Sequence, residues 1–289
     1  MNANSLHQAQ TINNWLVEAI PKLQKVGISS ARLDAELILA NSINKSRTYL
    51  HAHNNLLLNV DQTKTANSQL QRRTQHEPIA YIVGYKDFYG RKFIVTPNTL
   101  IPRPESEDFI EVLKKILPLN SIFYSSDDEP TPNPQLIDVG TGCGCLGITA
   151  KLEFSSLDVL LIDISKEALL VAQQNANIHS VTVNCLNNDM LKNLTYKPNI
   201  IIANLPYVDE TWEKSPDTGY EPHLALFADK NGLSSNELLI AQASEILKIN
   251  CYLLIEADPS QQLILCKYAK KYNFKLISIT GYVISFQKL

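Results

Sequence analysis

The chain has 289 residues, 45% of them hydrophobic, which is enough for one large core and a small second domain. Its 26 lysines and arginines nearly balance 29 aspartates and glutamates, so the formal net charge is only −3. Proteins that hold nucleic acid mainly through phosphate contacts are strongly basic, and we therefore expect no direct, stable binding to nucleic acid. We expect a monomer.

The N-terminal residues and the cysteines predict where the protein works. Residues 1–5 are polar and uncharged and no apolar stretch follows them, so we expect no signal peptide. No apolar run approaches the ~18 residues that cross a membrane. The five cysteines are odd in number and lack the CxxC spacing of a zinc site. We therefore expect a cytoplasmic protein with reduced cysteines, no metal site and no membrane contact.

Residues 1–76 are predicted to form a small helical domain. One apolar stripe recurs at helical spacing in the first helix: Ile12, Trp15, Leu16, Ala19, Ile20 and Leu23. Ser29 or Ser30 is placed to cap a second helix, and Asp61 to cap a third that continues to Arg73. No residue here requires a catalytic role, so we expect a substrate-docking domain. We interpret the pair Arg72–Arg73 as part of a solvated face.

Residues 77–104 are predicted to form a β-hairpin linker. Short β-type runs, at 78–84, 88–90 and 93–95, alternate with glycines. Two prolines then stiffen the segment 100–107 and hold Arg103 and Glu105 in fixed directions before a helix that starts near Ser106. A plain alternative is a linker that ends in prolines and a helix cap. The acidic, proline-rich stretch 121–134 is typical of a surface loop.

Residues 105–289 contain a larger α/β domain. From Gln135 onward, strand and helix patterns alternate, which indicates a parallel sheet covered on both faces. Strands are expected near 135–139, 158–162, 181–186, 199–203, 251–256 and 275–286. Helices are expected near 146–153, 165–178, 236–247 and 260–272.

A glycine-rich loop follows the first of these strands and opens a helix. Five of its residues are candidates for cofactor binding: Gly140, Thr141, Gly142, Cys143 and Gly144. Glycines allow a tight turn and a close approach of the backbone to a ligand. Asp163 ends the next strand about twenty positions later, where a carboxylate can accept hydrogen bonds from ribose hydroxyls. At the end of the third strand, Asp189 is placed to meet an adenine amine and Met190 to cover the ring. These features predict a nucleoside cofactor.

Two cofactors fit such a loop. The spacing of Gly142, Gly144 and Gly147 satisfies the dinucleotide fingerprint, so NAD is an alternative. However, Gly140 follows the strand directly and begins a GxGxG run, whereas the NAD alignment starts two residues late. Asp138 precedes the loop, and a carboxylate there suits a ligand with a positive centre better than a pyrophosphate. We therefore favour S-adenosylmethionine, which carries a sulfonium and an ammonium group.

A tetrad of residues follows the β-branched strand 200–203. Asn204 offers a side-chain carbonyl, and Pro206 keeps the backbone of Leu205 extended so that its own carbonyl points outward. Tyr207 adds a flat aromatic face. Such a corner at the carboxyl end of a parallel strand can accept two hydrogen bonds from a planar –NH2 group. The plain alternative is a strand that runs into an ordinary Asn-Pro turn.

Taken together, these motifs closely resemble those of the peptide chain release factor glutamine methyltransferases, the HemK/PrmC family. The resemblance rests on the Asp-x-Gly-Thr-Gly-x-Gly loop, a strand ending in Asn-x-Pro-Tyr, and the upstream Leu-Ile-Pro-Arg-Pro-Glu-x-Glu after a helical N-terminal domain. It implies a Rossmann-like S-adenosylmethionine-dependent methyltransferase sheet. The family usually has a first proline in the tetrad where this chain has Leu205.

The resemblance also implies the reaction and the residues. The substrate would be a peptide chain release factor, methylated on the side-chain amide of the glutamine in its Gly-Gly-Gln loop. Catalysis would fall to the tetrad Asn204, Leu205, Pro206 and Tyr207, and Asn204 would also contact the cofactor. Arg103 and Glu105 would join the tetrad in binding the substrate. The segment 208–228 would form a wall or lid, with Glu221–Pro222 as a fixed corner.

Two other functions stay open. The tetrad also resembles the Asn-Leu-Pro-Tyr form of the ribosomal RNA adenine dimethyltransferases. In that family, however, the catalytic domain comes before the helical domain, and the proteins are expected to be more basic. A protein with the cofactor fold that serves only as a binding scaffold is the non-enzyme alternative. The glycine loop and the tetrad together favour an enzyme.

Overall fold

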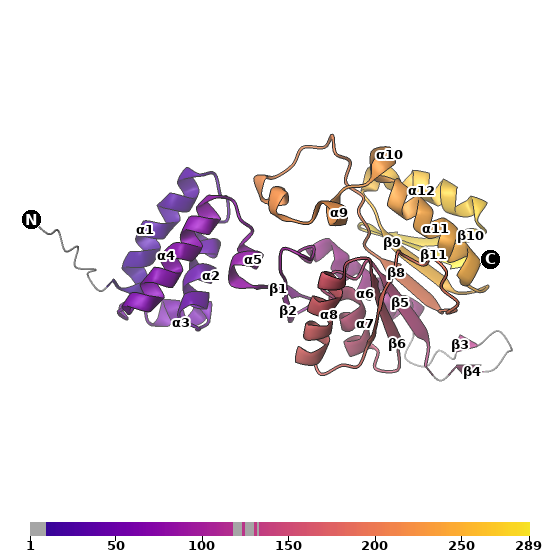
Figure 1. Ribbon diagram of the computed structural model, residues 1–289, viewed down its shortest axis with the longest axis horizontal. Coiled ribbons are helices and arrows are strands. Elements are labelled where there is room, and N and C mark those ends of the chain that lie inside the picture. Colours follow the sequence, from indigo (N-terminus) through magenta and orange to yellow (C-terminus); the bar gives the residue numbers. More distant parts are fainter. Residues whose placement is uncertain (1–9, 118–122, 125–129, 132) are drawn as a thin grey trace, which may run out of the picture. The chain divides into compact units, whose positions relative to one another are not determined.

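The computed structural model describes residues 10–117, 123–124, 130–131 and 133–289, which form two units (Figure 1). One unit contains the chain up to Gly84 together with Ser215–Tyr220. The other contains Tyr85–Lys214 and Glu221–Leu289. Most of the predicted acidic loop at 121–134 lies outside the described residues. Within them, no helix has both the length and the apolar character needed to span a membrane.

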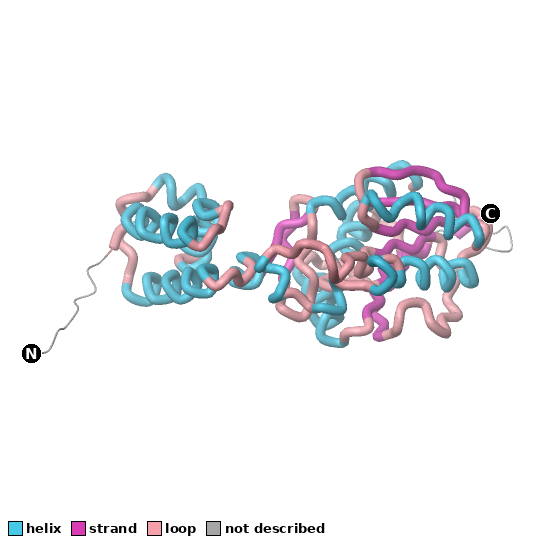
Figure 2. Tube along the Cα trace, turned by 90° about the horizontal axis from the view of Figure 1, so that it is seen from above, coloured by secondary structure: helices cyan, strands magenta, loops and turns pink. Residues whose placement is uncertain are grey.

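The first unit is helical, as expected, and Figure 2 shows only helices and loops among its described residues. Its elements are α1 (Ile12–Lys25), α2 (Ala31–Ser42), α3 (Arg47–Ala52), α4 (Val60–Thr74), α5 (Ile79–Val83) and the short 3-10 helix η2 (Pro216–Tyr220). The apolar stripe of α1 is buried, with Trp15 and Leu23 in the core against α2 and α4. Ser30 is the N-cap residue of α2.

Two expectations for this unit are wrong. The N-cap of α4 is Asn59, not Asp61, because Asn59 and Gln62 form a reciprocal capping box two residues earlier. The run 78–84 is expected to be of β type, but it contains helix α5, with Pro78 as its N-cap residue and the left-handed Gly84 as its C-cap residue. Its Ala80, Tyr81 and Ile82 are buried, so packing outweighs the β preference of the local sequence.

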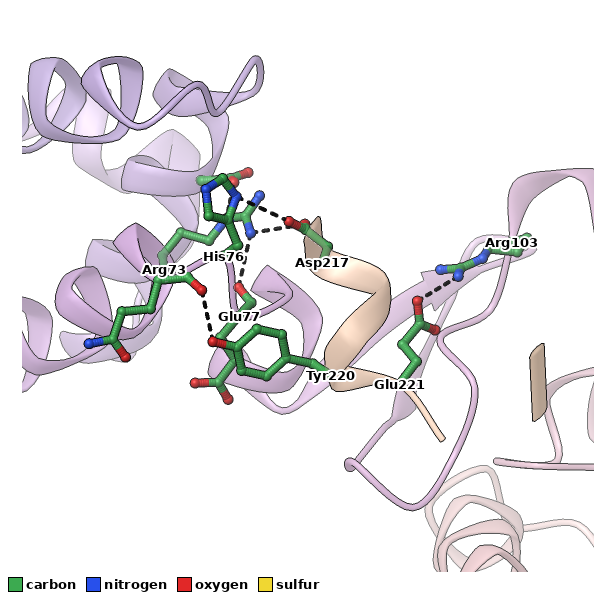
Figure 3. A network of polar contacts seen from close by, with 9 residues as sticks. Arg73, His76, Glu77, Arg103, Asp217, Tyr220 and Glu221 are labelled. Atoms are coloured by element: carbon green, nitrogen blue, oxygen red, sulfur yellow. Dashed lines mark hydrogen bonds and ion pairs between the residues drawn. The ribbon is translucent and has the colours of Figure 1, made fainter. Parts of the chain in front are cut away.

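Arg73 is buried, which overturns its interpretation as part of a solvated face. Its Nε donates to Asp34 Oδ2 at 2.7 Å, and its Nη1 lies 2.9 Å from Asp217 Oδ2 (Figure 3). Tyr220 adds a hydrogen bond of 2.7 Å from its hydroxyl to the carbonyl of Gln75. These contacts explain why a segment from the second half of the chain belongs to the helical unit. Arg72 instead pairs with Glu77.

The second unit begins with the predicted hairpin, β1 (Tyr85–Phe88) and β2 (Arg91–Ile94), followed by η1 (Pro104–Glu107) and α6 (Asp108–Ile116). The short pair β3 (Phe123–Tyr124) and β4 (Pro130–Thr131) comes next. The remaining elements are β5 (Gln135–Val139), α7 (Cys145–Glu153), β6 (Asp158–Asp163), α8 (Lys166–Ile178), β7 (Asn184–Asn187), β8 (Ile200–Ala203), α9 (His223–Leu226), α10 (Asp229–Gly232), α11 (Ser234–Ile246), β9 (Tyr252–Glu256), α12 (Pro259–Lys271), β10 (Phe274–Thr280) and β11 (Val283–Lys288).

A seven-stranded sheet in the order β10-β11-β9-β8-β5-β6-β7 forms the core of this unit. The five strands from β9 to β7 run parallel, and β11 is antiparallel to both β9 and β10. The expected single strand at 275–286 is therefore a hairpin that turns at Gly281. Alternate residues of the central strands pack with α11 and α12 on one face, while α6, α7 and α8 cover the other (Figure 1).

Candidate active site

A cavity of about 660 Å³ opens at the carboxyl ends of β5, β6, β7 and β8. This is where open α/β sheets place their ligands, and the volume suits a nucleoside cofactor and a substrate side chain. Its walls come from residues within 97–106, the glycine loop, the ends of β6 and β7, the first three residues of the tetrad with Glu210, and residues within 222–235.

The glycine loop, the acid after β6 and the tetrad contact one another. The backbone N–H of Gly142 donates to Asp163 Oδ2 at 2.9 Å. Gly140 has a φ of +69°, and a Cβ placed on it would lie 2.7 Å from a methyl carbon of Leu205. A side chain at Gly140 would therefore be strained by the backbone conformation and would displace the Leu205 side chain of the tetrad. Of the predicted loop residues, Gly140, Thr141, Gly142 and Cys143 line the cavity and Gly144 does not.

Asp138 does not face the cavity, which differs from the role we expected for it. Its side chain is buried under the loop, where Oδ2 accepts hydrogen bonds from the Thr141 hydroxyl at 2.6 Å and the Gly147 N–H at 2.9 Å. Burial raises the pKa of Asp138 to about 6. Asp138 therefore holds the loop in shape, and it is not among the residues that line the ligand space.

Asp163, Asp189 and Met190, which the sequence predicts to bind the cofactor, all line the cavity. Asp163 accepts backbone N–H groups on both oxygens, from Gly142 and, at 2.9 Å, from Ser165. Burial nevertheless raises its pKa above the usual range, because desolvation outweighs these donors. Asp189 is exposed and Met190 half-buried, so both can meet a ligand that enters from solvent.

The tetrad divides into residues that line the cavity and one that does not. Asn204, Leu205 and Pro206 line it, and Asn204 Nδ2 donates to the hydroxyl of Ser106 at 2.9 Å. The Tyr207 side chain lies outside the lining, and its hydroxyl donates to Glu256 Oε1 at 3.1 Å. Burial and the neighbouring carboxylate raise the pKa of Tyr207 well above its usual range, so its hydroxyl stays protonated.

The two residues of the proline segment that are predicted to bind the substrate, Arg103 and Glu105, lie in different surroundings. Arg103 lines the cavity, and its Nη2 lies 2.6 Å from Glu221 Oε1 (Figure 3). Glu221 is buried and also accepts the backbone N–H of Ile101 at 3.2 Å, which makes it the fixed corner that we expected. Glu105 is exposed and does not line the cavity.

Sequence reasoning missed Ser106 as a cavity residue and Glu256 as a partner of the tetrad. Ser106 was considered only as the start of a helix. Glu256 had a detectable signal, since it is a charged residue that ends the apolar strand β9 and is fully buried. Buried carboxylates need partners, so such a residue at the carboxyl edge of a parallel sheet is a candidate site residue.

The sheet order, the glycine loop after β5 and Asp163 at the end of β6 define the class: the Rossmann-like fold of S-adenosylmethionine-dependent methyltransferases. The catalytic domain of hMettl16, solved in complex with a MAT2A 3′UTR hairpin 6, shares this fold with a TM-score of 0.50. The two are 10% identical over 79% of this chain and 82% of that chain. The expected fold class is confirmed.

Sequence comparisons identify the family. The PrmC N-terminal domain matches residues 14–84, and the methyltransferase small domain matches residues 125–219. A release factor glutamine methyltransferase of Koribacter versatilis is 33% identical over 265 residues, covering 88% of this chain and 90% of that protein. One from Leptospira interrogans is 38% identical, covering 82% of each chain. The chain belongs to the release factor glutamine methyltransferase family.

Longer relatives also match. A bifunctional methyltransferase of Rickettsia bellii is 34% identical over 272 residues. The match covers 87% of this chain but 49% of that protein, so the chain spans about half the length of this relative.

Proposed function

We propose that the protein methylates the side-chain amide nitrogen of the glutamine in the Gly-Gly-Gln loop of a peptide chain release factor, with S-adenosylmethionine as the methyl donor. One observation carries the proposal: Asn204 and Leu205 line the same cavity as the glycine loop and Asp163. One N–H of the Asn204 side chain already donates a hydrogen bond to Ser106. Its carbonyl oxygen is therefore the atom left to accept a hydrogen bond from a substrate amide.

The residues around the cavity fit S-adenosylmethionine. Gly140 and Gly142 present backbone without side chains, and both adopt positive φ values that most residues avoid. Asp163 retains lone pairs for the ribose hydroxyls. Asp189 and Met190 line the same cavity, where Asp189 would accept a hydrogen bond from the adenine amine and Met190 would cover the ring. When bound, the cofactor supplies an electrophilic methyl group on a sulfonium sulfur.

The protein's contribution to the reaction is to orient a poor nucleophile. An amide nitrogen reacts slowly because its lone pair is delocalised into the carbonyl. Asn204 Oδ1 and the Leu205 carbonyl would each accept one N–H of the substrate amide, which fixes the nitrogen toward the methyl group. The same two oxygens stabilise the positive charge that develops on the nitrogen. The product proton then becomes acidic enough to leave to water, so no strong general base is required.

Leucine in place of the family's proline is compatible with this role. The backbone carbonyl is the proposed acceptor, and leucine retains it. The Leu205 side chain is 5% exposed and packs against Gly140, which supplies by contact part of the rigidity that a proline ring would give. Pro206 restricts the backbone of Leu205 as well.

The helical unit would bind the body of the release factor as a docking domain. Its match to the PrmC N-terminal domain supports this role. We further propose that the enzyme acts as a monomer in the cytoplasm and that it needs no direct, stable contact with nucleic acid.

The variant Asn204→Ala tests the proposal. Labelled methyl transfer to a purified release factor should fall about 100- to 1000-fold, because one of two charge-stabilising acceptors is lost. Affinity for S-adenosylmethionine, measured by calorimetry, should stay nearly unchanged. Mass spectrometry of the wild-type product should place the methyl group on the glutamine.

The matched control is Asn177→Ala, which removes an exposed asparagine of α8 outside the cavity and should keep full activity. Full activity in Asn204→Ala would contradict the proposal. Label on 30S particles in place of the release factor would favour a ribosomal RNA adenine methyltransferase. Failure of the wild-type protein to bind the cofactor would favour a scaffold.

A further inference from the structure

A short chain of buried hydrogen bonds lies behind Asn204. Asn204 Nδ2 donates to Ser106 Oγ at 2.9 Å, and Ser106 Oγ donates to Glu256 Oε2 at 2.6 Å. The other carboxylate oxygen of Glu256 accepts the Tyr207 hydroxyl at 3.1 Å. Ser106 is 2% exposed and Glu256 fully buried. The Glu256 carboxylate thus binds the Tyr207 hydroxyl directly and is linked to the Asn204 amide through Ser106.

The donors and acceptors in this series of hydrogen bonds allow a single orientation of the Asn204 amide. When Glu256 is ionised it has no proton to give, so the one hydroxyl proton of Ser106 goes to Glu256. The oxygen of Ser106 can then only accept, and the group that faces it must be the –NH2 of Asn204. The carbonyl oxygen of Asn204 is consequently turned away from Ser106. In the reverse orientation, Asn204 would oppose its own N–H groups to those of a substrate amide.

The fold brings these residues together from separate segments. β8 and β9 are parallel neighbours, with Ala203 paired to Ile255, so Asn204 and Glu256 follow side by side at the sheet edge. Ser106 comes from η1. Asn236 of α11 donates to the backbone carbonyl of Glu256 at 2.9 Å, which fixes the strand end. The carboxylate is therefore anchored at both its backbone and its side chain.

We propose that Glu256 and Ser106 are positioning residues for methyl transfer: they set the amide orientation of Asn204 so that its carbonyl oxygen receives the substrate. This inference rests on the proposed function, because it assigns Asn204 the role of an acceptor for a planar –NH2 group. Burying a carboxylate is costly unless its oxygens are satisfied, and here both are used to orient the tetrad.

The test compares two substitutions of Ser106. Ser106→Ala removes the hydroxyl and should lower kcat about 10- to 100-fold, since a small misplacement of an orienting group has an effect of this size. Ser106→Thr keeps the hydroxyl and should recover most of that loss. Affinity for S-adenosylmethionine should change little in either variant. The control Ser285→Ala removes another buried hydroxyl, which bonds to Ser278 away from the cavity, and should keep the wild-type kcat.

A measurement without catalysis separates this inference from the proposed function. The side-chain –NH2 signal of Asn204 in ¹⁵N-labelled protein, identified by its loss in Asn204→Asp, should exchange slowly with solvent in the wild type. It should shift and exchange faster in Ser106→Ala.

Each outcome has a distinct meaning. Wild-type protein that binds the cofactor but methylates no glutamine would refute the proposed function. The amide signal would still test whether Ser106 and Glu256 position Asn204. Three results would each overturn the positioning role of Ser106 and Glu256. They are full kcat in Ser106→Ala, equal losses in Ser106→Ala and Ser106→Thr, and an Asn204 side-chain signal in the wild type that is not protected from exchange.

Discussion

Asp138 shows how one residue links the glycine loop to the stability of the fold. Its carboxyl group is 1% exposed, and Oδ1 has no hydrogen-bond partner among the residues that the structure describes. The loop gains two hydrogen bonds from Oδ2, but ionisation at this depth is unfavourable. The native state therefore favours the neutral carboxyl group at pH values below the Asp138 pKa of about 6.

This pKa predicts a loss of stability with rising pH. The folded value of about 6 lies above the ordinary 3.8, so the stabilising contribution of Asp138 is fully present below pH 3.8 and is lost as the pH rises through 6. The gap between the two values corresponds to about 3 kcal/mol. Asp138→Asn should abolish this part of the pH dependence, as measured by urea unfolding between pH 4 and pH 7.

The control for this prediction is Asp87→Asn, which changes an exposed aspartate of β1. Its free energy of unfolding should follow the wild-type pH dependence. If Asp138→Asn shows the same slope as the wild type, Asp138 is ionised in the native protein across this pH range.

Single residues also show what the sequence can and cannot predict. Local patterns predict Gly140, Asp163, Asp189, Met190 and Asn204 as site residues, because each follows on or ends a recognisable strand, and all five line the cavity. The interpretation of Arg73 as solvated is wrong because Asp217, one of its two partners, is 144 residues away in the sequence. Ser106 is missed for the same reason, because its contact with Glu256 spans 150 residues. Glu256 does leave a local signal, since it is a charged residue at the end of the apolar strand β9.

Helix α10 ends against the tetrad, and Gly232 makes this close approach possible. A Cβ at this position would lie 2.0 Å from the Tyr207 carbonyl oxygen and 2.4 Å from Gln261 Nε2, which itself donates to that carbonyl at 2.8 Å. Gly232 also has a φ of +79°. The backbone after Pro206 is thus fixed by a glycine and a buried glutamine on two separate elements.

Gly232→Ala should therefore disturb both stability and activity. We expect the free energy of unfolding to fall by about 2 kcal/mol or more, because a backbone clash adds to left-handed strain. Methylation should fall as well, since the shift of the Tyr207 carbonyl displaces the tetrad. Urea unfolding and the methyl-transfer assay give the two values.

The control variant Gly90→Ala separates the effect of backbone strain from the effect of a steric clash, which are combined in Gly232→Ala. Gly90 has a φ of +70° in the turn between β1 and β2, but a Cβ there would meet no atom within 4 Å. This control should show a modest loss of stability with full activity. Equal effects of the two variants would mean that the contact with Tyr207 is unimportant.

Among the elements, regular patterns were predictable and irregular ones were not. The central strands and helices were located to within a few residues, because buried parallel strands are continuous apolar runs. Helix α5 was mistaken for a strand because a five-residue apolar run has no clear periodicity. The hairpin β10–β11 was taken as one strand because the short turn at Gly281 barely interrupts the pattern.

The helical unit depends on a charge pair that is buried in its core. Arg73 and Asp34 are 6% and 2% exposed at their side chains, whereas Asp217 is 32% exposed. Asp34→Ala should lower the free energy of unfolding of this unit by about 3 kcal/mol, because it deprives a buried charge of its main partner. Asp217→Ala should cost about 1 kcal/mol or less, since that pair is partly solvated.

Trp15 fluorescence reports unfolding of this unit in a Trp212→Phe background, because Trp15 lies in its core. Asp61→Ala, an exposed aspartate of α4, is the control and should change stability by less than about 0.5 kcal/mol. Equal losses in Asp34→Ala and Asp217→Ala would contradict the ranking that burial predicts.

The partnership of Arg73 with Asp217 sets an order of events during synthesis. The ribosome makes the chain from its N-terminus, so α1 to α5 emerge long before η2 exists. Arg73 then has Asp34 but must wait for Asp217, which is made only after the glycine loop and the tetrad. The helical unit can therefore start to fold before the second unit, but it cannot be completed until most of the second unit has been synthesised. A fragment that stops at Gly84 would be permanently held at that incomplete stage.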